Sequence, residues 1–353
     1  MIQSLKAVSR KLVPKRIRYR LKVLYFTMCS RIDLGFILSH PAHKSNRSTY
    51  CHMLWDSVFI ENNGFVFICC GHKPGVVGNI YEDDLKTIWT QSRRLERFRL
   101  ESLQGFLKCF KNCTILKEGE KLSEVIPPGC KDHPRRVWLL YGTLCNQECI
   151  MCGQYGKSKK MLDNEILKKR IDWTKVEEIE LQGGEILAME GAKELYLWLT
   201  QTMDKKVNLI TNGMLIDDAW ANYLVKGSDW VQVSVNAATK RIHESVNRGS
   251  RYEIVIGNLK RLVRTKKEVN SNTMIVFKFT ATRENLHEMA DAIRLAEDLG
   301  CDSIAFGFDD TVKPLLNNKP ELRQKVKDEI STVLGEVSKI EVEKNRLKYL
   351  KLV

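Results

Sequence analysis

The stretch Cys145-Asn-Gln-Glu-Cys149-Ile-Met-Cys152 decides how the rest of this chain is interpreted. It places three thiols within eight residues, directly after the apolar run at residues 137–141. A C-x3-C-x2-C loop can present three thiolates to one face of an iron–sulfur cube and leave the fourth iron without a protein ligand. An iron with an open coordination position can bind and activate a small molecule. A zinc knuckle is the alternative interpretation of the spacing.

The bulk composition predicts a soluble, globular protein. The chain has 353 residues, enough for one large domain and a smaller one, and 43% of them are hydrophobic. No stretch of about 18 uncharged apolar residues is present, and the start lacks the pattern of a secretory signal. The eleven cysteines lie mostly in tight groups, which favours metal ligation in a reducing compartment over disulfides. We therefore expect a cytoplasmic protein.

The positive charge is concentrated at the start of the chain. The formal net charge is +14, and residues 1–47 hold eleven Lys and Arg residues against a single acid, Asp33. Residues 1–47 therefore predict a basic, partly amphipathic helical arm. Such an arm can lie on an anionic membrane surface, bind nucleic acid or an acidic peptide, or remain a solvated extension.

A small cysteine-containing module is expected at residues 48–130. Two β-rich runs, residues 57–61 and 65–69, flank Asn62-Asn63-Gly64, and Asn-Gly between such runs is a strong hairpin signal. Residues 84–103 show the apolar spacing of a single helix.

From residue 131 to 353 the pattern alternates between strand and helix. Six strands are predicted, at residues 137–141, 177–181, 207–210, 230–235, 274–280 and 303–308. Amphipathic helices are predicted between them, at residues 192–203, 217–226, 252–267 and 286–299. Repeated βα units predict an α/β domain with a parallel sheet and its crossover helices outside.

Polar or glycine-rich segments follow four successive predicted strands. The cysteine loop follows the first, Gly183-Gly184-Glu185 the second and Thr211-Asn212-Gly213 the third, while Ser234 and Asn236 end the fourth. In a parallel βα barrel these positions all lie at the C-terminal mouth, where loops build active sites. The sequence therefore predicts one site assembled from these four segments.

These residues resemble the radical S-adenosylmethionine (SAM) enzymes over roughly residues 135–308. The resemblance implies a partial (β/α)6 barrel in which Cys145, Cys149 and Cys152 hold a [4Fe–4S] cluster, with SAM chelating the open iron. It further implies SAM-binding residues, with Glu185 receiving the amino group, Ser234 and Asn236 near the ribose and Arg248 near the carboxylate. The full predicted set is Gly183, Gly184, Glu185, Asn212, Ser234, Asn236 and Arg248.

The activity implied by this resemblance is reductive cleavage of SAM to a 5′-deoxyadenosyl radical, which abstracts hydrogen from an unidentified substrate. The difficult chemistry belongs to the cofactors, and the protein contributes positioning and exclusion of water. The residue before the third cysteine is usually aromatic in this family, and here it is Met151, which can also pack on a ring. Flavodoxin or ferredoxin is implied as the electron donor.

The module at residues 48–130 resembles the SPASM/twitch auxiliary-cluster module, placed before the barrel. Twelve residues separate Cys51 from Gly64, and four separate Gly64 from Cys69, as the module's pattern requires. The resemblance implies a second [4Fe–4S] cluster held by Cys51, Cys69, Cys109 and Cys113. Cys70 and Cys130 compete for these positions. A four-cysteine zinc site that staples a small module is the alternative.

A second cluster with four protein ligands suits electron transfer better than substrate binding. We therefore expect it to accept an electron from the substrate radical, so that the net reaction is an oxidation. Related enzymes modify ribosomal peptides or oxidise sugars and aminocyclitols, and both substrate classes remain open. The rival hypothesis is a non-catalytic, metal-stapled protein that binds nucleic acid or an anionic surface through its basic arm.

Overall fold

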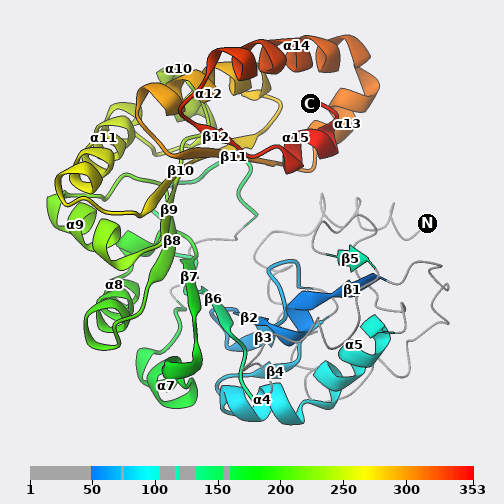
Figure 1. Ribbon diagram of the computed structural model, residues 1–353, viewed down its shortest axis with the longest axis vertical. Coiled ribbons are helices and arrows are strands. Elements are labelled where there is room, and N and C mark those ends of the chain that lie inside the picture. The colour runs from blue at the N-terminus through cyan, green and yellow to red at the C-terminus, as the bar shows by residue number, and fades with distance from the viewer. Residues whose placement is uncertain (1–48, 73–74, 104–115, 119–131, 154–159) are drawn as a thin grey trace. The chain divides into compact units, whose positions relative to one another are not determined.

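The computed structural model describes residues 49–72, 75–103, 116–118, 132–153 and 160–353 (Figure 1). The described residues fall into two compact units. The first unit holds the described residues up to Thr143 together with residues 160–180, and the second holds residues 144–153 and Leu181–Val353. The predicted basic arm lies outside the described residues. The predicted domain limits, 1–47, 48–130 and 131–353, stay a prediction.

The first unit combines short strands with short helical segments. Its strands are β1 (Thr49–Cys51), β2 (Ser57–Ile60), β3 (Phe65–Phe67), β4 (Gly78–Asn79), β5 (Leu116–Glu118) and β6 (Arg136–Leu140). Its α-helices are α4 (Leu85–Gln91), α5 (Arg93–Leu103) and α7 (Asn164–Arg170), and 3-10 turns are η1 (His52–Trp55) and η2 (Trp173–Lys175). Strand β7 (Glu178–Gln182) carries the chain from the first unit into the second.

The second unit alternates strands with helices. Its strands are β8 (Val207–Thr211), β9 (Trp230–Ser234), β10 (Met274–Ala281), β11 (Ser303–Phe308) and β12 (Glu341–Val342). Its α-helices are α8 (Glu190–Leu197), α9 (Asp218–Gly227), α10 (Lys240–Val246), α11 (Tyr252–Glu268), α12 (Met289–Asp298), α13 (Val312–Asn318), α14 (Pro320–Glu336) and α15 (Asn345–Leu350). Shorter turns are η3 (Ile186–Ala188), the π-helical η4 (Trp198–Thr202) and η5 (Leu286–Glu288).

The predicted hairpin forms and joins the first strand of the predicted barrel. Strands β2 and β3 are antiparallel, with Phe59 opposite Phe67, and β2 also pairs in parallel with β6. Phe59, Phe65 and Phe67 bury their rings together with Val76 in one apolar cluster. The hairpin of the cysteine module therefore extends the sheet that begins at β6, a pairing that the sequence pattern did not predict.

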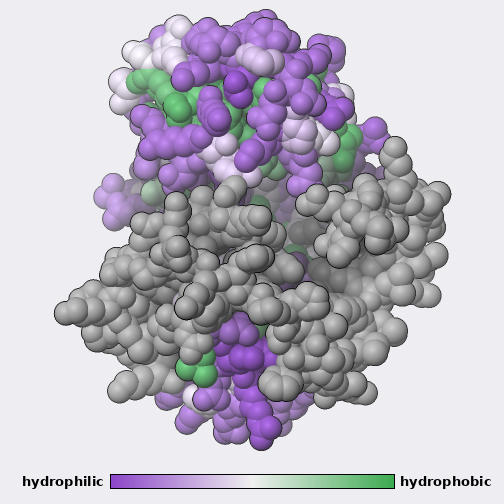
Figure 2. All heavy atoms as spheres, turned by 90° about the vertical axis from the view of Figure 1, so that its right-hand side faces the viewer, coloured by the Kyte–Doolittle hydropathy of each residue, from purple (hydrophilic) through white to green (hydrophobic). Residues whose placement is uncertain are grey.

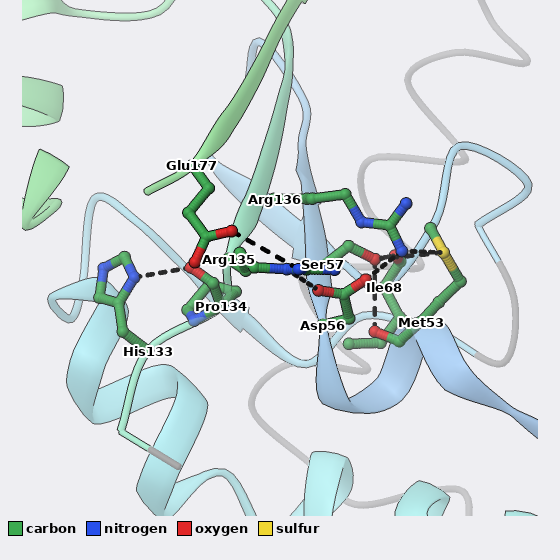
Figure 3. Close-up of polar contacts among 9 residues, drawn as sticks. All are labelled: Met53, Asp56, Ser57, Ile68, His133, Pro134, Arg135, Arg136 and Glu177. Atoms are coloured by element: carbon green, nitrogen blue, oxygen red, sulfur yellow. Dashed lines mark hydrogen bonds and ion pairs between the residues drawn. The ribbon is translucent and has the colours of Figure 1, made fainter. Parts of the chain in front are cut away.

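A buried carboxylate fixes the start of β6 beside β2 (Figure 3). Asp56 is 2% exposed, and its side chain accepts hydrogen bonds from Arg135 Nε at 3.0 Å and from Arg136 Nη2. Its carbonyl oxygen accepts from the backbone N–H groups of both arginines at 2.9 Å. Arg135 also lies 3.5 Å from the carboxylate of Glu177. Two guanidinium groups thus compensate a carboxylate whose isolated burial would be costly.

The single helix predicted over residues 84–103 is wrong, because two helices, α4 and α5, occupy this segment. Ser92 stands between them in an extended conformation. Its hydroxyl donates to Val77 O at 2.6 Å and accepts from Leu95 N at 3.3 Å. The serine therefore ends α4 and helps to start α5, which is a role that serine side chains favour over the helix interior.

Parallel strands form the sheet of the second unit, in the order β12-β11-β10-β9-β8. Each predicted strand from residue 207 to residue 308 is confirmed to within two residues. Helices α9, α11 and α12 lie along one side of these strands (Figure 1). The side chains on that side are buried and apolar, and include Leu209, Val231, Val233, Phe277, Phe279 and Phe306.

The other face of these strands is more polar. Gln232, Ser234, Lys278 and Thr280 alternate with the buried apolar residues and are only partly buried. Because successive side chains in a strand point to opposite faces, the polar residues share the face away from the covering helices. In a βα barrel this second face is the interior one, and active sites lie at the carboxyl ends of the strands. The predicted α/β class with a partial barrel is confirmed at this level.

The outer surface of the second unit is largely hydrophilic on the side shown in Figure 2. Helix α14 contributes exposed charged residues such as Glu321 and Lys325, whereas Val326, Ile330 and Val333 of the same helix are buried. Within the described ranges, no helix combines the length and the apolar character needed to cross a bilayer.

Replacing Gly64 by Ala tests the turn between β2 and β3. Gly64 has φ +85°, and an added Cβ would overlap the ring of Tyr81 and the side-chain oxygen of Asn79. We expect Gly64→Ala to lower the free energy of unfolding by about 2–4 kcal/mol, because a left-handed backbone and overpacking both act against it. Denaturant titration followed by tryptophan fluorescence measures the change.

Gly75→Ala is the matched control in the same unit. An added Cβ there meets only Phe98 Cζ at 3.6 Å, an ordinary contact. We expect Gly75→Ala to change stability by less than about 0.5 kcal/mol. Equal stabilities for the two variants would show that the turn does not require a glycine.

Candidate SAM and iron–sulfur site

The cysteine loop at residues 144–153 belongs to the second unit, and hydrogen bonds within the loop involve its own cysteines. Gln147 N lies 3.4 Å from Cys145 Sγ, and Gln147 Oε1 accepts from Cys149 Sγ at 3.4 Å. Cys152 N donates to Cys149 O at 3.1 Å. Cys145 and Cys149 are partly buried, whereas Cys152 is exposed. The three cysteines thus differ in exposure, and Cys152 is the most open to solvent.

Backbone hydrogen bonds from two other segments hold this loop. Glu148 N donates to Arg248 O at 2.8 Å, and Ile150 N donates to Val246 O at 2.9 Å. On the other side, Glu185 N donates to Leu144 O at 2.8 Å. Because these are bonds between backbone groups, they need no particular side chain. The position of the loop therefore depends on the backbone positions of the two neighbouring segments.

Close packing completes the support of the loop. Gly249 has φ +85°, and a Cβ on it would lie 3.2 Å from Asn146 O. A side chain at this position would therefore combine backbone strain with crowding against the loop. Ile150 and Met151 pack on a buried cluster of Ala237, Ile242 and Val246. Met151, which stands where the family usually has an aromatic residue, thus has an apolar support.

The three thiols affect one another electrostatically. Burial, with smaller contributions from the charges of Cys152 and Cys145, raises the pKa of Cys149 to about 12. Burial also raises the pKa of Cys145, with smaller contributions that raise it from Glu185 and Cys152. Metal binding reverses this preference, because thiolate ligands are deprotonated by the bound cation.

This donor set fits an iron–sulfur cube. Cysteine thiolates are the usual ligands of [4Fe–4S] clusters, and each thiolate binds a different iron. The loop supplies three such thiolates and no fourth protein ligand from within its own motif. In the part of the chain that the structure describes, no three His, Cys, Asp or Glu side chains converge closely enough to hold a single metal ion.

Glu185 is fully buried and its carboxylate is occupied by the protein itself. Thr211 Oγ1 donates to Oε1 at 2.8 Å, Leu187 N donates to Oε1 at 3.1 Å, and Asn212 N donates to Oε2 at 2.6 Å. Burial raises the pKa of Glu185, and the hydrogen bonds from Asn212, Thr211 and Leu187 lower it. The contact of Glu185 with the SAM amino group stays a prediction, as do those of Gly183 and Gly184.

Asn212 reaches from the end of β8 to the cysteine loop. Its Nδ2 donates to Asn146 Oδ1 at 2.7 Å and lies 3.9 Å from Cys145 Sγ. Its Oδ1 accepts from Met214 N at 3.0 Å. Sequence reasoning selected Asn212 but not its partner Asn146, although Asn146 lies inside the quoted motif. Thr211 was likewise quoted without the role that its hydroxyl plays at Glu185.

Ser234 and Asn236 differ in whether their side chains form hydrogen bonds with the described residues. Asn236 is 5% exposed, and it donates to Asn247 Oδ1 at 2.9 Å while accepting from Thr280 N at 2.7 Å. The Ser234 side chain is partly buried and makes no hydrogen bond with the described residues. Arg248 is exposed, and its guanidinium forms no ion pair in those same ranges. Ser234 and Arg248 therefore keep polar groups that a ligand can use.

A buried histidine connects Asn236 to the segment that supports the loop. His243 Nε2 lies 2.9 Å from Ser250 Oγ, and Asn247 Nδ2 lies 3.3 Å from the same ring nitrogen. Asn247 in turn accepts the hydrogen bond from Asn236. Burial lowers the pKa of His243 to about 4, so the ring is neutral at pH 7. Nothing in the sequence pattern pointed to His243.

The predicted auxiliary-cluster cysteines are only partly within the described residues. Cys51 ends β1, is buried, and its N–H donates to Ser102 Oγ at 2.9 Å. Cys69 and Cys70 follow β3, the first partly buried and the second exposed. Cys109, Cys113 and Cys130 lie outside the described residues. The ligand set of a second cluster therefore stays a prediction.

Comparison with protein families agrees with both cysteine regions. Residues 139–295 match the family model described as the radical SAM superfamily, and residues 51–114 match that of SPASM, an iron–sulfur cluster-binding domain. Residues 139–295 therefore form a radical SAM domain. The radical SAM domain implies a [4Fe–4S] cluster with SAM, and the SPASM domain implies auxiliary iron–sulfur clusters. The predicted order, with the SPASM module before the barrel, is confirmed.

Curated relatives of this radical SAM protein are distant. A probable GTP 3′,8-cyclase of Saccharolobus islandicus is 24% identical over 169 residues, which is 46% of this chain and 52% of the relative. A probable GTP 3′,8-cyclase of Methanocaldococcus jannaschii is 24% identical over 162 residues, covering 44% and 53%. The chain thus spans about half the length of the curated relatives it matches.

Several solved structures are similar to part of this chain. Streptococcus suis SuiB bound to S-adenosylmethionine has a TM-score of 0.47 at 14% identity, over 60% of this chain and 50% of that one. SuiB bound to precursor peptide SuiA gives 0.46 at 13%, over 81% and 71%. The protein anSMEcpe with bound AdoMet and a peptide gives 0.39 at 20%, over 49% and 50%.

The neutral His243 predicts a loss of stability in acid. Its folded pKa of about 4 lies below the ordinary value of 6.5, so the unfolded chain binds a proton first as the pH falls. The stability contribution is therefore complete above pH 6.5 and is lost as the pH falls toward 4, by about 2 kcal/mol at pH 5. We expect His243→Gln to remove this part of the pH dependence.

Urea midpoints at pH 7 and pH 5 measure the effect. His287→Gln is the matched control, because His287 is exposed on the same unit, with a side-chain exposure of 55%. The control should keep the pH dependence of the unmodified protein. The interpretation fails if His243→Gln loses as much stability between the two pH values as the control does.

Proposed function

We propose that this chain is a radical SAM enzyme whose cluster is held by Cys145, Cys149 and Cys152. One observation carries the proposal: the three-thiol loop is fixed by backbone bonds to Arg248, Val246 and Glu185. Each of these positions lies in or beside a segment of the predicted SAM site. The proposal is further supported by the match to the radical SAM superfamily over residues 139–295.

When bound, a reduced [4Fe–4S] cluster with SAM supplies the electron that breaks a sulfonium C–S bond and gives a hydrogen-abstracting 5′-deoxyadenosyl radical. The chain's own residues bind and orient SAM. The hydroxyl of Ser234 is available to the ribose, and the exposed guanidinium of Arg248 is available to the carboxylate. Asn212 and Asn146 brace each other beside Cys145. Positioning of this kind is the protein's main contribution in cofactor enzymes.

The finer proposal concerns the net reaction and its partners. We propose an oxidation of the substrate, either a peptide modification or a sugar or alcohol dehydrogenation, in which an auxiliary cluster of the SPASM region receives an electron. Flavodoxin or ferredoxin is proposed as the reductant. The relatives' name, probable GTP 3′,8-cyclase, and the peptide bound by SuiB point to different substrate classes. The substrate is therefore left as a small molecule or a peptide.

The basic segment at residues 1–47 belongs to the alternative function. A non-catalytic protein that binds nucleic acid or an anionic surface through this segment would not cleave SAM, and its affinity would fall steeply with salt. The enzyme proposal also includes this segment. It places the enzyme in the cytoplasm, in peripheral contact with a membrane through residues 1–47.

Removing any thiol of the motif should abolish SAM cleavage. We expect Cys145→Ala, Cys149→Ala and Cys152→Ala each to lower 5′-deoxyadenosine formation by more than about 100-fold, since loss of a mere supporting partner costs roughly 10–100-fold. The assay uses anaerobically reconstituted protein, dithionite and SAM, with the product measured by liquid chromatography. Cys301→Ala is the matched control, because Cys301 is a buried thiol outside the motif. Absence of 5′-deoxyadenosine from the unmodified protein would refute the proposed function.

Metal analysis separates a second cluster from a zinc site. We expect Cys51→Ala and Cys69→Ala each to lose about four irons per chain while SAM cleavage persists. Loss of the oxidised product in these variants would support the electron-acceptor role. A content of about one zinc per chain that disappears in both variants would favour the zinc alternative instead.

A further inference from the structure

Lys278 shares a face of the sheet with the predicted ribose contact. It lies in β10, where its register partners are Ser234 of β9 and Ala305 of β11. In parallel strands, residues in the same register point their side chains to the same face. Lys278 and Ser234 therefore project side by side from neighbouring strands.

This shared face is the one away from the covering helices. Phe277 and Phe279, the neighbours of Lys278 in β10, are fully buried, and Phe279 packs against Phe306 with ring centroids 5.9 Å apart. Helix α12 contacts both β10 and β11. Because side chains alternate along a strand, Lys278 leaves the sheet on the side opposite to these phenylalanines. That is the interior side of a partial barrel.

The side chain of Lys278 extends across β11. A Cβ on Gly307 would lie 3.5 Å from Lys278 Cε and 3.7 Å from Lys278 Nζ. Neighbouring strands are about 4.8 Å apart. Asn212 at the end of β8 stands beside Cys145, Ser234 is on the next strand, and the Lys278 ammonium lies beyond both. The predicted ribose position therefore lies between the cysteine loop and the Lys278 ammonium.

Among the described residues, no carboxylate forms an ion pair with the Lys278 ammonium. Lys278 makes no side-chain hydrogen bond or ion pair with the described residues, and the group is only partly buried. Burial lowers its pKa, with Glu343 raising it and Arg346 lowering it again. A cation withdrawn from water without a partner carries a desolvation cost that an anionic ligand would offset.

Further cations lie at the adjacent end of β11. Phe308 stacks on Tyr349 of α15 with ring centroids 5.3 Å apart. Lys313 Nζ lies 3.6 Å from the Tyr349 ring centroid, and the Arg346 guanidinium lies 5.8 Å from that of Phe308. Of these groups, Arg346 acts electrostatically on Lys278, and its positive charge favours an anion there. Phe308 is in register with Ala281, on the face of the sheet opposite to Lys278.

We propose that Lys278 binds an anionic group of the substrate, a carboxylate or a phosphate, on the interior face of the barrel next to the SAM ribose position. The proposal rests on the proposed function, because it places the substrate beside SAM. It makes Lys278 a substrate-binding residue distinct from Arg248, which lies on the segment that holds the cysteine loop.

Trace acetylation with peptide mass spectrometry tests the proposal on the full-length, reconstituted protein. Pyrophosphate and glutarate are the two probes, compared with chloride at equal ionic strength. We expect at least one probe at millimolar concentration to slow acetylation of Lys278 by roughly threefold or more, by mass action on an occupied site. Lys240, an exposed lysine paired with Glu253 at 2.5 Å, is the control and should not change.

The probes distinguish the two sources of the anion. Protection by pyrophosphate alone indicates a phosphate-bearing substrate, and protection by glutarate alone indicates a carboxylate. Failure of both probes, or equal protection of Lys240, overturns the proposal. Full protection by SAM in the absence of either probe also overturns it, because Lys278 would then bind the SAM carboxylate.

Two variants complete the test. Lys278→Met should weaken calorimetric binding of the protecting probe by roughly tenfold or more, as expected for the loss of a charge-assisted hydrogen bond, and Lys278→Arg should retain most of it. Cleavage of SAM alone should stay within about twofold in both variants, because neither changes a SAM ligand. Loss of that cleavage in Lys278→Met would assign Lys278 to the SAM site and overturn the proposal. A failure of the unmodified protein to cleave SAM would instead count against the proposed function and leave the protection result intact.

Discussion

The fully buried carboxylate of Glu185 is the constraint on which the mouth of the second unit depends. It accepts hydrogen bonds from the Thr211 hydroxyl, the Asn212 N–H and the Leu187 N–H, while its own N–H binds Leu144 O. A buried charge without such partners would cost several kcal/mol. The end of β8 and the start of η3 must therefore stay where their donors reach this group. Asn212, held in this way, stands beside Cys145.

The cysteine loop receives its second support from the segment at residues 246–248. Two backbone hydrogen bonds join the loop to this segment. Asn247 of the segment contacts both the neutral ring of His243 and the side chain of Asn236. A division of labour follows among the polar residues of the site. The side chains of Glu185 and Asn236 form hydrogen bonds within the protein. Ser234 and Arg248 keep polar groups that a ligand can use.

Much of the local structure could be predicted from sequence, and the exceptions have identifiable causes. Strand limits in the second unit followed from apolar runs and their turn signals, and the hairpin followed from Asn63-Gly64. The break at Ser92 was missed, because the apolar spacing continues through it while the serine hydroxyl bonds to Val77 O from outside the segment. The pairing of β2 with β6 was missed as well, since it joins residues that are distant in the chain.

The sequence by itself determined which atoms are available for chemistry: three thiols at cluster spacing, a glycine where the hairpin needs positive φ, and polar residues after successive strands. These are local properties, set by residue type and by neighbours along the chain. Only the tertiary structure decided which of those polar groups remain available and which face Lys278 occupies. The physical reason is that both depend on the register between strands that are far apart in sequence, and a shift of one residue would turn every side chain of a strand to the opposite face.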